Sequence, residues 1–202
     1  MQARLIVFEG VDAVGKSTLA AHSHSLIVGF NPSAELLSFP GQRSGSLGRL
    51  VYELHHNPKP LGVERISPLA LQTLHIAAHL DAITSIILPS IASNRWVVLD
   101  RFWWSTWVYG RAAGIDPRTL DSLIHAEKLT LGGLKPSVVF LVERSAPFGS
   151  ASPDADFNKL TTLYQELSAM ERAQYEVVHL LDQEFEAARN SIAEWLNRRR
   201  EK

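Results

Sequence analysis

The stretch RLIVFEGVDAVGKST, residues 4–18, decides the fold. Its first part, residues 4–8, is an apolar run rich in β-branched and aromatic residues, which predicts a short buried strand. Gly10 to Ser17 then fits the pattern G-x-x-x-x-G-K-[ST], and a helical stretch follows over residues 16–28. A strand, a glycine-rich loop and a helix in this order are the context that a phosphate-binding loop requires. The sequence therefore predicts a site where backbone N–H groups and a helix N-terminus surround a phosphate.

Each residue that this pattern specifies has a chemical role. Gly10 and Gly15 let the backbone turn around an anion, and Lys16 reaches the β- and γ-phosphates of a nucleoside triphosphate. The Ser17 hydroxyl would be a ligand for Mg²⁺, and Thr18 follows it in the first helical turn. We predict that these five residues bind ATP and Mg²⁺. The alternative is a glycine-rich turn with a surface lysine, and the strand and helix on either side argue against it.

The rest of the chain alternates apolar runs with helical segments. Further strands are predicted at residues 35–39, 95–100, 138–142 and 176–182. Strands that alternate with helices form a parallel sheet covered on both faces, so we expect a three-layer α/β fold with a five-stranded parallel sheet. No linker interrupts residues 1–202, which we expect to form one domain. Residues 145–156 are small and polar with two prolines, which indicates a mobile loop.

The composition excludes several classes of protein. The 202 residues contain 20 Lys and Arg against 21 Asp and Glu, a formal charge of −1, and no cysteine. A near-neutral chain is a poor candidate for binding nucleic acid, and a chain without cysteine has no disulfide or thiol chemistry. An apolar run long enough for a signal peptide or for a membrane span of about 18 residues is missing from the sequence. We therefore expect a cytoplasmic protein without nucleic-acid or membrane partners.

Asp100 and Arg101 form a second candidate site. Asp100 ends an apolar strand at its carboxyl end, where ligands of open α/β sheets bind. A carboxylate in that position can bind Mg²⁺, and the adjacent arginine can bridge two phosphates through paired hydrogen bonds. The alternatives are a helix cap for Asp100 and a surface ion pair for Arg101.

These motifs together resemble the thymidylate kinase family. The resemblance rests on Phe8-Glu9-Gly10-Val11-Asp12 with Gly15-Lys16-Ser17-Thr18, on Phe39-Pro40 followed by Arg43-Ser44, and on Asp100-Arg101-Phe102 with Ser105-Thr106 and Tyr109-Gly110. Pro136 with residues 138–143, and a helix from Phe157 through Tyr164 to Leu167, also fit. It covers most of the chain. The phosphate loop is specific only to a superfamily, whereas the Asp-Arg-Phe segment narrows the match.

The resemblance implies a P-loop nucleoside monophosphate kinase fold with a lid, at about residues 145–156, that closes over ATP. The implied reaction is phosphoryl transfer from Mg-ATP to a nucleoside monophosphate, most simply dTMP to dTDP. Asp12 and Arg43 would position the acceptor, with Arg101 near its phosphate and Tyr109 beside the sugar. A homodimer packed through helices is also implied.

The chain departs from the family pattern at the acceptor base. His75 and His79 stand where the family usually has a phenylalanine and an arginine, and Thr106 and Gly110 replace the usual polar partners near Tyr109. Residues four apart share one face of a helix, so both imidazoles can face the base. We assign His75, His79 and Thr106 to acceptor binding. A different deoxynucleotide or deoxynucleoside acceptor is therefore an alternative to dTMP.

A second departure concerns catalysis. The family places an arginine in the phosphate loop or in the lid, but this loop has Ala13 and Val14, and the lid has no cation. We predict that Arg144, at the base of the lid, takes this role alongside Lys16, Asp12 and Arg101; Arg111 is the other candidate. A weakly catalytic ATP-binding homologue is the third interpretation, since loss of such an arginine costs a factor of about 10³–10⁵ in related chemistry.

Overall fold

A five-stranded parallel sheet forms the centre of the computed structural model, which describes residues 4–149, 152–182 and 184–200. The strands lie in the order β2-β3-β1-β4-β5. Their bounds are β1 Leu5–Glu9, β2 Glu35–Ser38, β3 Val97–Asp100, β4 Val138–Glu143 and β5 Val177–Leu181. The predicted fold class and its strand number are confirmed.

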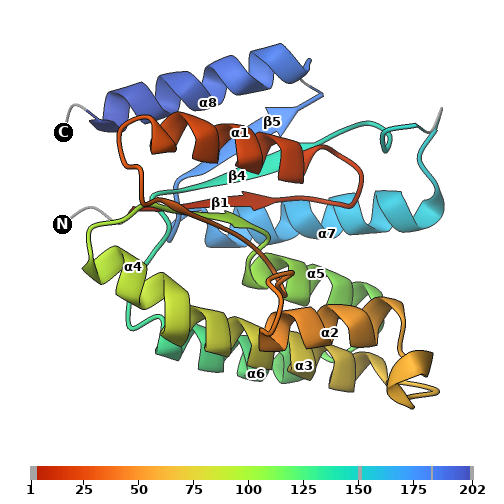
Figure 1. Ribbon diagram of the computed structural model, residues 1–202. Helices are drawn as coiled ribbons and strands as arrows, with labels where there is room; N and C mark the ends of the chain where they lie inside the picture. The colour runs from red at the N-terminus through yellow and green to blue at the C-terminus, as the bar shows by residue number, and fades with distance from the viewer. Residues whose placement is uncertain (1–3, 150–151, 183, 201–202) are drawn as a thin grey trace.

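Helices cover both faces of this sheet (Figure 1). One face carries α1 (Lys16–Val28) and α8 (Phe185–Arg200), and the other carries α5 (Trp103–Ala112) and α7 (Ala155–Glu171). A further group of helices packs beyond α5 and consists of α2 (Leu47–His56), α3 (Pro68–Ala82), α4 (Leu88–Ala92) and α6 (Pro117–Thr130). A short 3₁₀ turn, Lys59–Leu61, joins α2 to α3. The layers follow from burial, because every residue of β1, β3 and β4 is buried and needs cover on both sides.

The tryptophans after Asp100 belong to this core. Trp103, Trp104 and Trp107 on α5 are all buried, and none of them lines the cavity described below. Trp103 and Trp104 contact Tyr175 through their rings. All three tryptophans therefore serve core packing.

Residues 68–92 form one long helical segment in spite of Pro89. A π-helical stretch, Ile83–Ile87, separates α3 from α4 just before the proline. Proline removes an N–H donor and clashes with the carbonyl four residues earlier, and a widened turn relieves both. By length and composition this segment is the one described helix that could cross a membrane, so the expectation that the sequence has no stretch long and apolar enough for a span is wrong on that criterion. Here α3 packs against α2, α5 and α6, as a helix of a globular α/β protein does.

The sheet order brings the sequence motifs to one edge. β1 pairs with β3, with Phe8 opposite Asp100, so the phosphate loop and the Asp100–Arg101 pair follow neighbouring parallel strands. Carboxyl ends of parallel strands lie at the same edge of a sheet. Residues 83 to 89 positions apart in the sequence therefore meet at one site.

Candidate active site

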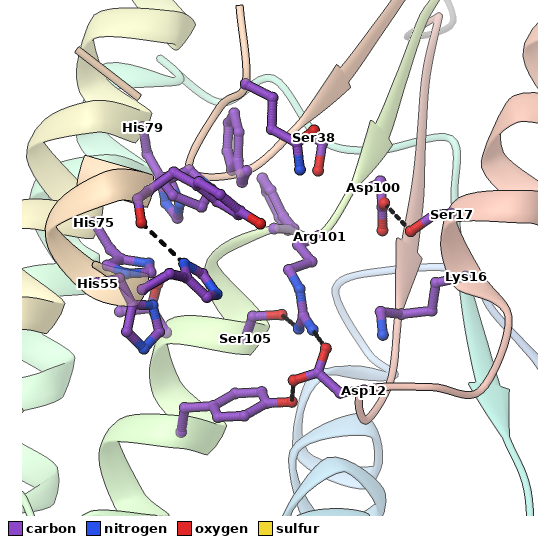
Figure 2. A pocket seen from close by; sticks show the side chains of 18 of the residues that line it. Asp12, Lys16, Ser17, Ser38, His55, His75, His79, Asp100, Arg101 and Ser105 are labelled. Atoms are coloured by element: carbon purple, nitrogen blue, oxygen red, sulfur yellow. Dashed lines mark hydrogen bonds and ion pairs between the residues drawn. The ribbon is translucent and has the colours of Figure 1, made fainter. Parts of the chain in front are cut away.

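A cavity of about 730 Å³ opens at this edge of the sheet. The phosphate loop forms one side, the ends of β2 and β3 form the floor, and α2, α3 and α5 form the far wall. Figure 2 shows Lys16, Ser17 and Asp100 on one side and His55, His75 and His79 on the other, with Arg101 between them. The cavity thus has a phosphate end and an aromatic end.

Lys16 lies at the phosphate end and is buried beneath the loop. Its Nζ donates to the Val11 carbonyl at 2.6 Å, which closes the loop around the ammonium group. Burial and the neighbouring Arg101 guanidinium lower the pKa of Lys16 to about 8, although Asp12 and Asp100 partly oppose this. Phosphate oxygens beside this ammonium would stabilise its charged form, since they supply negative charge in a poorly solvated place. The arrangement favours a polyanionic ligand.

Ser17 and Asp100 provide hard oxygen ligands next to Lys16. The Ser17 hydroxyl donates to Asp100 Oδ2 at 2.6 Å. The other carboxylate oxygen, Oδ1, is buried and has no hydrogen-bond partner among the described residues. Mg²⁺ prefers carboxylate and hydroxyl oxygens and keeps several waters. An orphaned carboxylate oxygen beside a serine hydroxyl therefore fits the predicted Mg²⁺ site.

Arg101 lies at the centre of the cavity, and its backbone has an unusual conformation. Its φ is +79°, in the left-handed region that residues other than glycine rarely adopt. Its guanidinium donates to Asp12 and, at 2.9 Å, to the Ser105 hydroxyl, and it lies 5.3 Å from the centre of the Tyr109 ring (Figure 2). Such a guanidinium can bind phosphate oxygens through parallel hydrogen bonds.

Asp12 connects the phosphate loop to α5. It accepts hydrogen bonds from Arg101 and, at 2.7 Å, from the Tyr109 hydroxyl. Burial by itself would raise the pKa of Asp12, but the Arg101 guanidinium and the Tyr109 hydroxyl hold that pKa below its ordinary value. Burial raises the pKa of Tyr109 to about 12. Asp12 is thus an anion that orients Arg101 and Tyr109, and its predicted role in positioning the acceptor stays a prediction.

The aromatic end of the cavity is a histidine wall, formed by His55 and His56 on α2 and by His75 and His79 on α3. The His55 ring lies 5.2 Å from His75 and 4.6 Å from His56, measured between ring centres. Tyr52 stacks on His56 at 4.2 Å. The sequence pattern did not single out Tyr52, His55 or His56. Their spacing of three and four residues places them on one helix face, which is the signal that could have identified them.

The two histidines predicted to contact the base have different environments. Burial, together with His79 and His55, lowers the pKa of His75 to about 3, so His75 is a neutral ring at physiological pH. His79 is buried between Phe39, which stacks on it at 4.0 Å, and Glu127, whose Oε2 lies 2.9 Å from its Nδ1. A carboxylate partner at one nitrogen determines which nitrogen carries the proton and how the ring is oriented.

The remaining predicted residues lie in various places. Thr18 and Thr106 line the cavity, and the Thr106 hydroxyl is buried without a hydrogen-bond partner among the described residues. Arg43 is 59% exposed, outside the cavity lining, and its guanidinium lies 3.3 Å from Glu35. Arg144 lies at the end of β4 with its guanidinium 3.9 Å from the centre of the Phe148 ring. The roles assigned to Arg43 and Arg144 stay predictions.

The predicted lid is a short loop that lies on the phosphate loop. Phe148 N donates to the Ala13 carbonyl at 2.8 Å, and the Phe148 ring lines the cavity. A side chain at Gly15 would come within 3.0 Å of this ring, which gives Gly15 a packing reason in addition to its φ of +99°. Residues 150–151 of the predicted lid lie outside the described part of the chain, and α7 begins at Ala155.

Fold and site together define the class: a P-loop protein with the nucleoside monophosphate kinase fold. The thymidylate kinase family model matches residues 8–192. The chain therefore belongs to the thymidylate kinase family, which confirms the resemblance seen in the sequence. The crystal structure of thymidylate kinase from Ehrlichia chaffeensis has the same fold, with a TM-score of 0.77 and 20% identity over 95% of this chain and 97% of that one.

Curated relatives agree with the family assignment. The thymidylate kinase of Parasynechococcus marenigrum is 32% identical over 142 residues, which are 68% of this chain and 66% of the relative. The thymidylate kinase of Chlorobium limicola is 31% identical over 70% of this chain and 61% of the relative. That of Prochlorococcus marinus strain MIT 9303 is 30% identical over 78% of this chain and 73% of the relative. The matched part thus spans about two thirds of these relatives' own length.

Proposed function

We propose that this protein transfers the γ-phosphoryl group of Mg-ATP to dTMP, which yields ADP and dTDP. The observation that carries the proposal is the single cavity in which Lys16, Ser17 and Asp100 face an aromatic wall across Arg101. One end fits a triphosphate with its metal ion, and the other end fits a planar base. Membership of the thymidylate kinase family supports dTMP as the acceptor.

The residues would act mainly by positioning and charge neutralisation. Backbone N–H groups of the loop and the Lys16 ammonium would bind the β- and γ-phosphates. Ser17 and Asp100 would hold Mg²⁺, which neutralises charge on the transferring group. Arg101, oriented by Asp12, would bind the acceptor phosphate. A phosphate oxygen is already a competent nucleophile, so this chemistry requires no dedicated general base.

A different deoxynucleoside monophosphate is the second candidate acceptor, and the histidine wall favours it. An arginine presents several fixed N–H donors to a base, whereas a neutral imidazole presents one donor and one acceptor. Its binding preference among base edges therefore differs from that of an arginine. His75, which is neutral, keeps a flat ring for stacking but adds a polar nitrogen.

Product formation from Mg-ATP with dTMP, dUMP, dCMP, dAMP, dGMP and thymidine separates these possibilities. Nucleotides should be resolved chromatographically, so that the diphosphate is seen directly. We expect dTDP from dTMP. Diphosphate from another acceptor would preserve the kinase and refute the thymine assignment. ADP without a phosphorylated acceptor, or tight ATP binding without turnover, would favour a weakly catalytic ATP-binding homologue.

We also propose a homodimer that packs through α2 and α3. Leu47 and Leu50 on α2, Leu61 in the connecting turn and Leu69 on α3 are exposed. Exposed leucines of this kind gain stability when a second copy covers them. Sedimentation equilibrium of wild type and of a Leu50→Glu, Leu69→Glu variant tests this: we expect a dimer that the two charges dissociate, and a wild-type monomer would refute it.

A further inference from the structure

A polar network lies directly behind Arg101, with one member, Ser105, in the cavity lining and the other two buried behind it. It consists of Glu9 at the end of β1, Ser105 on α5 and Tyr164 on α7. Glu9 is 0% exposed and Tyr164 is 1% exposed. Groups of this kind are rarely buried unless hydrogen bonds offset the loss of water, so each contact in the network is informative.

The Glu9 carboxylate is bonded at both oxygens. Oε1 accepts from the backbone N–H of Phe102 at 2.7 Å and of Ser105 at 3.1 Å, both at the start of α5, where the Ser105 N–H also donates to the Phe102 carbonyl at 3.1 Å. Oε2 accepts from the Ser105 hydroxyl at 2.7 Å and from the Tyr164 hydroxyl at 3.1 Å. Burial raises the pKa of Glu9, and the charge of Arg101 and these donors oppose the rise.

Ser105 joins this carboxylate to Arg101. A serine hydroxyl has one proton, and here it points to Glu9, so the oxygen lone pairs are free to accept. They accept from the Arg101 guanidinium at 2.9 Å, and the Tyr164 hydroxyl lies 2.9 Å away. Removal of the Tyr164 hydroxyl would let both the serine hydroxyl and the carboxylate reorient, and Arg101 would lose a fixed partner.

The same contacts hold the backbone of Arg101. Its N–H donates to the Phe8 carbonyl at 2.9 Å, and the next N–H, of Phe102, donates to Glu9. A non-glycine residue at φ +79° persists only when surrounding contacts determine its conformation. Glu9 and its partners therefore help to hold the Arg101 backbone, and together with Asp12 they determine where its guanidinium points.

We propose that Glu9, Ser105 and Tyr164 are positioning residues that hold the Arg101 guanidinium in place for the phosphate of the acceptor. The inference rests on the proposed function, in which the acceptor is a nucleoside monophosphate. Among the described residues, the lysine and arginine side chains that line the cavity are those of Lys16 and Arg101. Because Lys16 serves the loop side, the direction of Arg101 decides how the acceptor phosphate is held.

This role can be tested by calorimetric measurement of the affinities for nucleoside monophosphates and for the corresponding nucleosides. Only the monophosphate has a phosphate group that Arg101 can bind. The variant is Tyr164→Phe, which removes one hydroxyl and keeps the buried ring. Its matched control is Ser168→Ala, which removes a buried hydroxyl of the same helix that contacts His179 at 3.1 Å. We expect Tyr164→Phe to weaken dTMP binding about tenfold and to change thymidine binding less than about twofold, because one misplaced charged partner costs about a tenfold affinity.

The control should leave both affinities at their wild-type values. Equal losses for dTMP and thymidine in Tyr164→Phe, or no loss for either, would overturn the inference. Ser105→Ala provides a second, more exposed substitution and should show the same selective loss. The pairs dCMP and deoxycytidine, dAMP and deoxyadenosine, and dGMP and deoxyguanosine are measured in parallel. If wild type binds another monophosphate in place of dTMP, the thymine assignment is refuted. The inference is then decided by comparing, in Tyr164→Phe, the loss of affinity for that monophosphate with the loss for its own nucleoside.

Discussion

Acidification should destabilise this protein through His75, and replacement of His75 by phenylalanine should remove that part of the loss. His75 lies on α3 and contacts His55 on α2, and burial together with His79, His55 and Arg101 disfavours a positive charge there. Its Nε2 is buried without a hydrogen-bond partner among the described residues. The folded protein therefore holds the neutral ring, with a pKa of about 3 against 6.5 for the free side chain.

The size of the effect follows from proton linkage. A group whose pKa is depressed by folding stabilises the folded state above its unfolded pKa, and this stability is lost as the pH falls toward the folded pKa. Between pH 7 and pH 5 the unfolded chain takes up most of one proton at this site while the folded chain takes up almost none. At about 1.4 kcal/mol for each unit, the free energy of unfolding falls by about 2 kcal/mol over this range. The result hardly depends on how far below 5 the folded pKa lies.

Urea unfolding of wild type and His75→Phe at pH 7, 6 and 5 measures this directly, because the protonation of other groups largely cancels in the difference. Wild type should lose about 2 kcal/mol more than His75→Phe. His125→Phe, on the exposed side of α6, is the control and should follow wild type. A difference between wild type and His75→Phe that stays constant from pH 7 to pH 5 would refute the buried, neutral His75.

Three further predictions concern the reaction. Asp100→Asn should raise the Mg²⁺ concentration needed for half-maximal activity at least about tenfold, since a metal ligand is weakened; an unchanged Mg²⁺ titration contradicts the assignment. Phe148→Ala should raise the ratio of ADP to nucleoside diphosphate formed, because the ring that covers the phosphate loop is lost, whereas Phe148→Leu should keep the ratio near one; equal ratios in the two variants argue against a water-excluding role. Arg144→Ala should lower kcat at least about tenfold if Arg144 neutralises the transferring group, and Arg118→Ala on α6 is the exposed control; turnover within a few-fold of wild type removes Arg144 from the mechanism.

Several features of the site were predictable because they are local in the sequence. The phosphate loop needs a strand, a turn and a helix in direct succession, and residues 4–28 contain all three. Asp100 follows an apolar run, so its place at the carboxyl end of a strand could also be inferred. The parallel sheet followed from the alternation of strands and helices, which leaves few other topologies.

Other features depend on how elements pack against one another. The histidine wall joins α2 to α3, and the sequence alone does not show that His55 lies beside His75. The partner of His79 is Glu127, which is 48 residues away on α6. Arg43 illustrates the same point, because its guanidinium pairs with Glu35 on the edge strand β2 and lies outside the cavity lining.

The class of chemistry could be inferred from the sequence, because the phosphate loop and the Asp-Arg pair are each formed by residues that are close together in the chain. What surrounds Arg101, in contrast, depends on how distant elements pack. Glu9, Ser105 and Tyr164 lie on three different elements and meet only because β1, α5 and α7 pack together. Tyr164 is 59 positions from Ser105 and 155 positions from Glu9 in the sequence. A hydrogen bond between residues far apart in the chain carries a cost in loop-closure entropy, and burial of the whole core offsets that cost. A local sequence pattern does not contain this information.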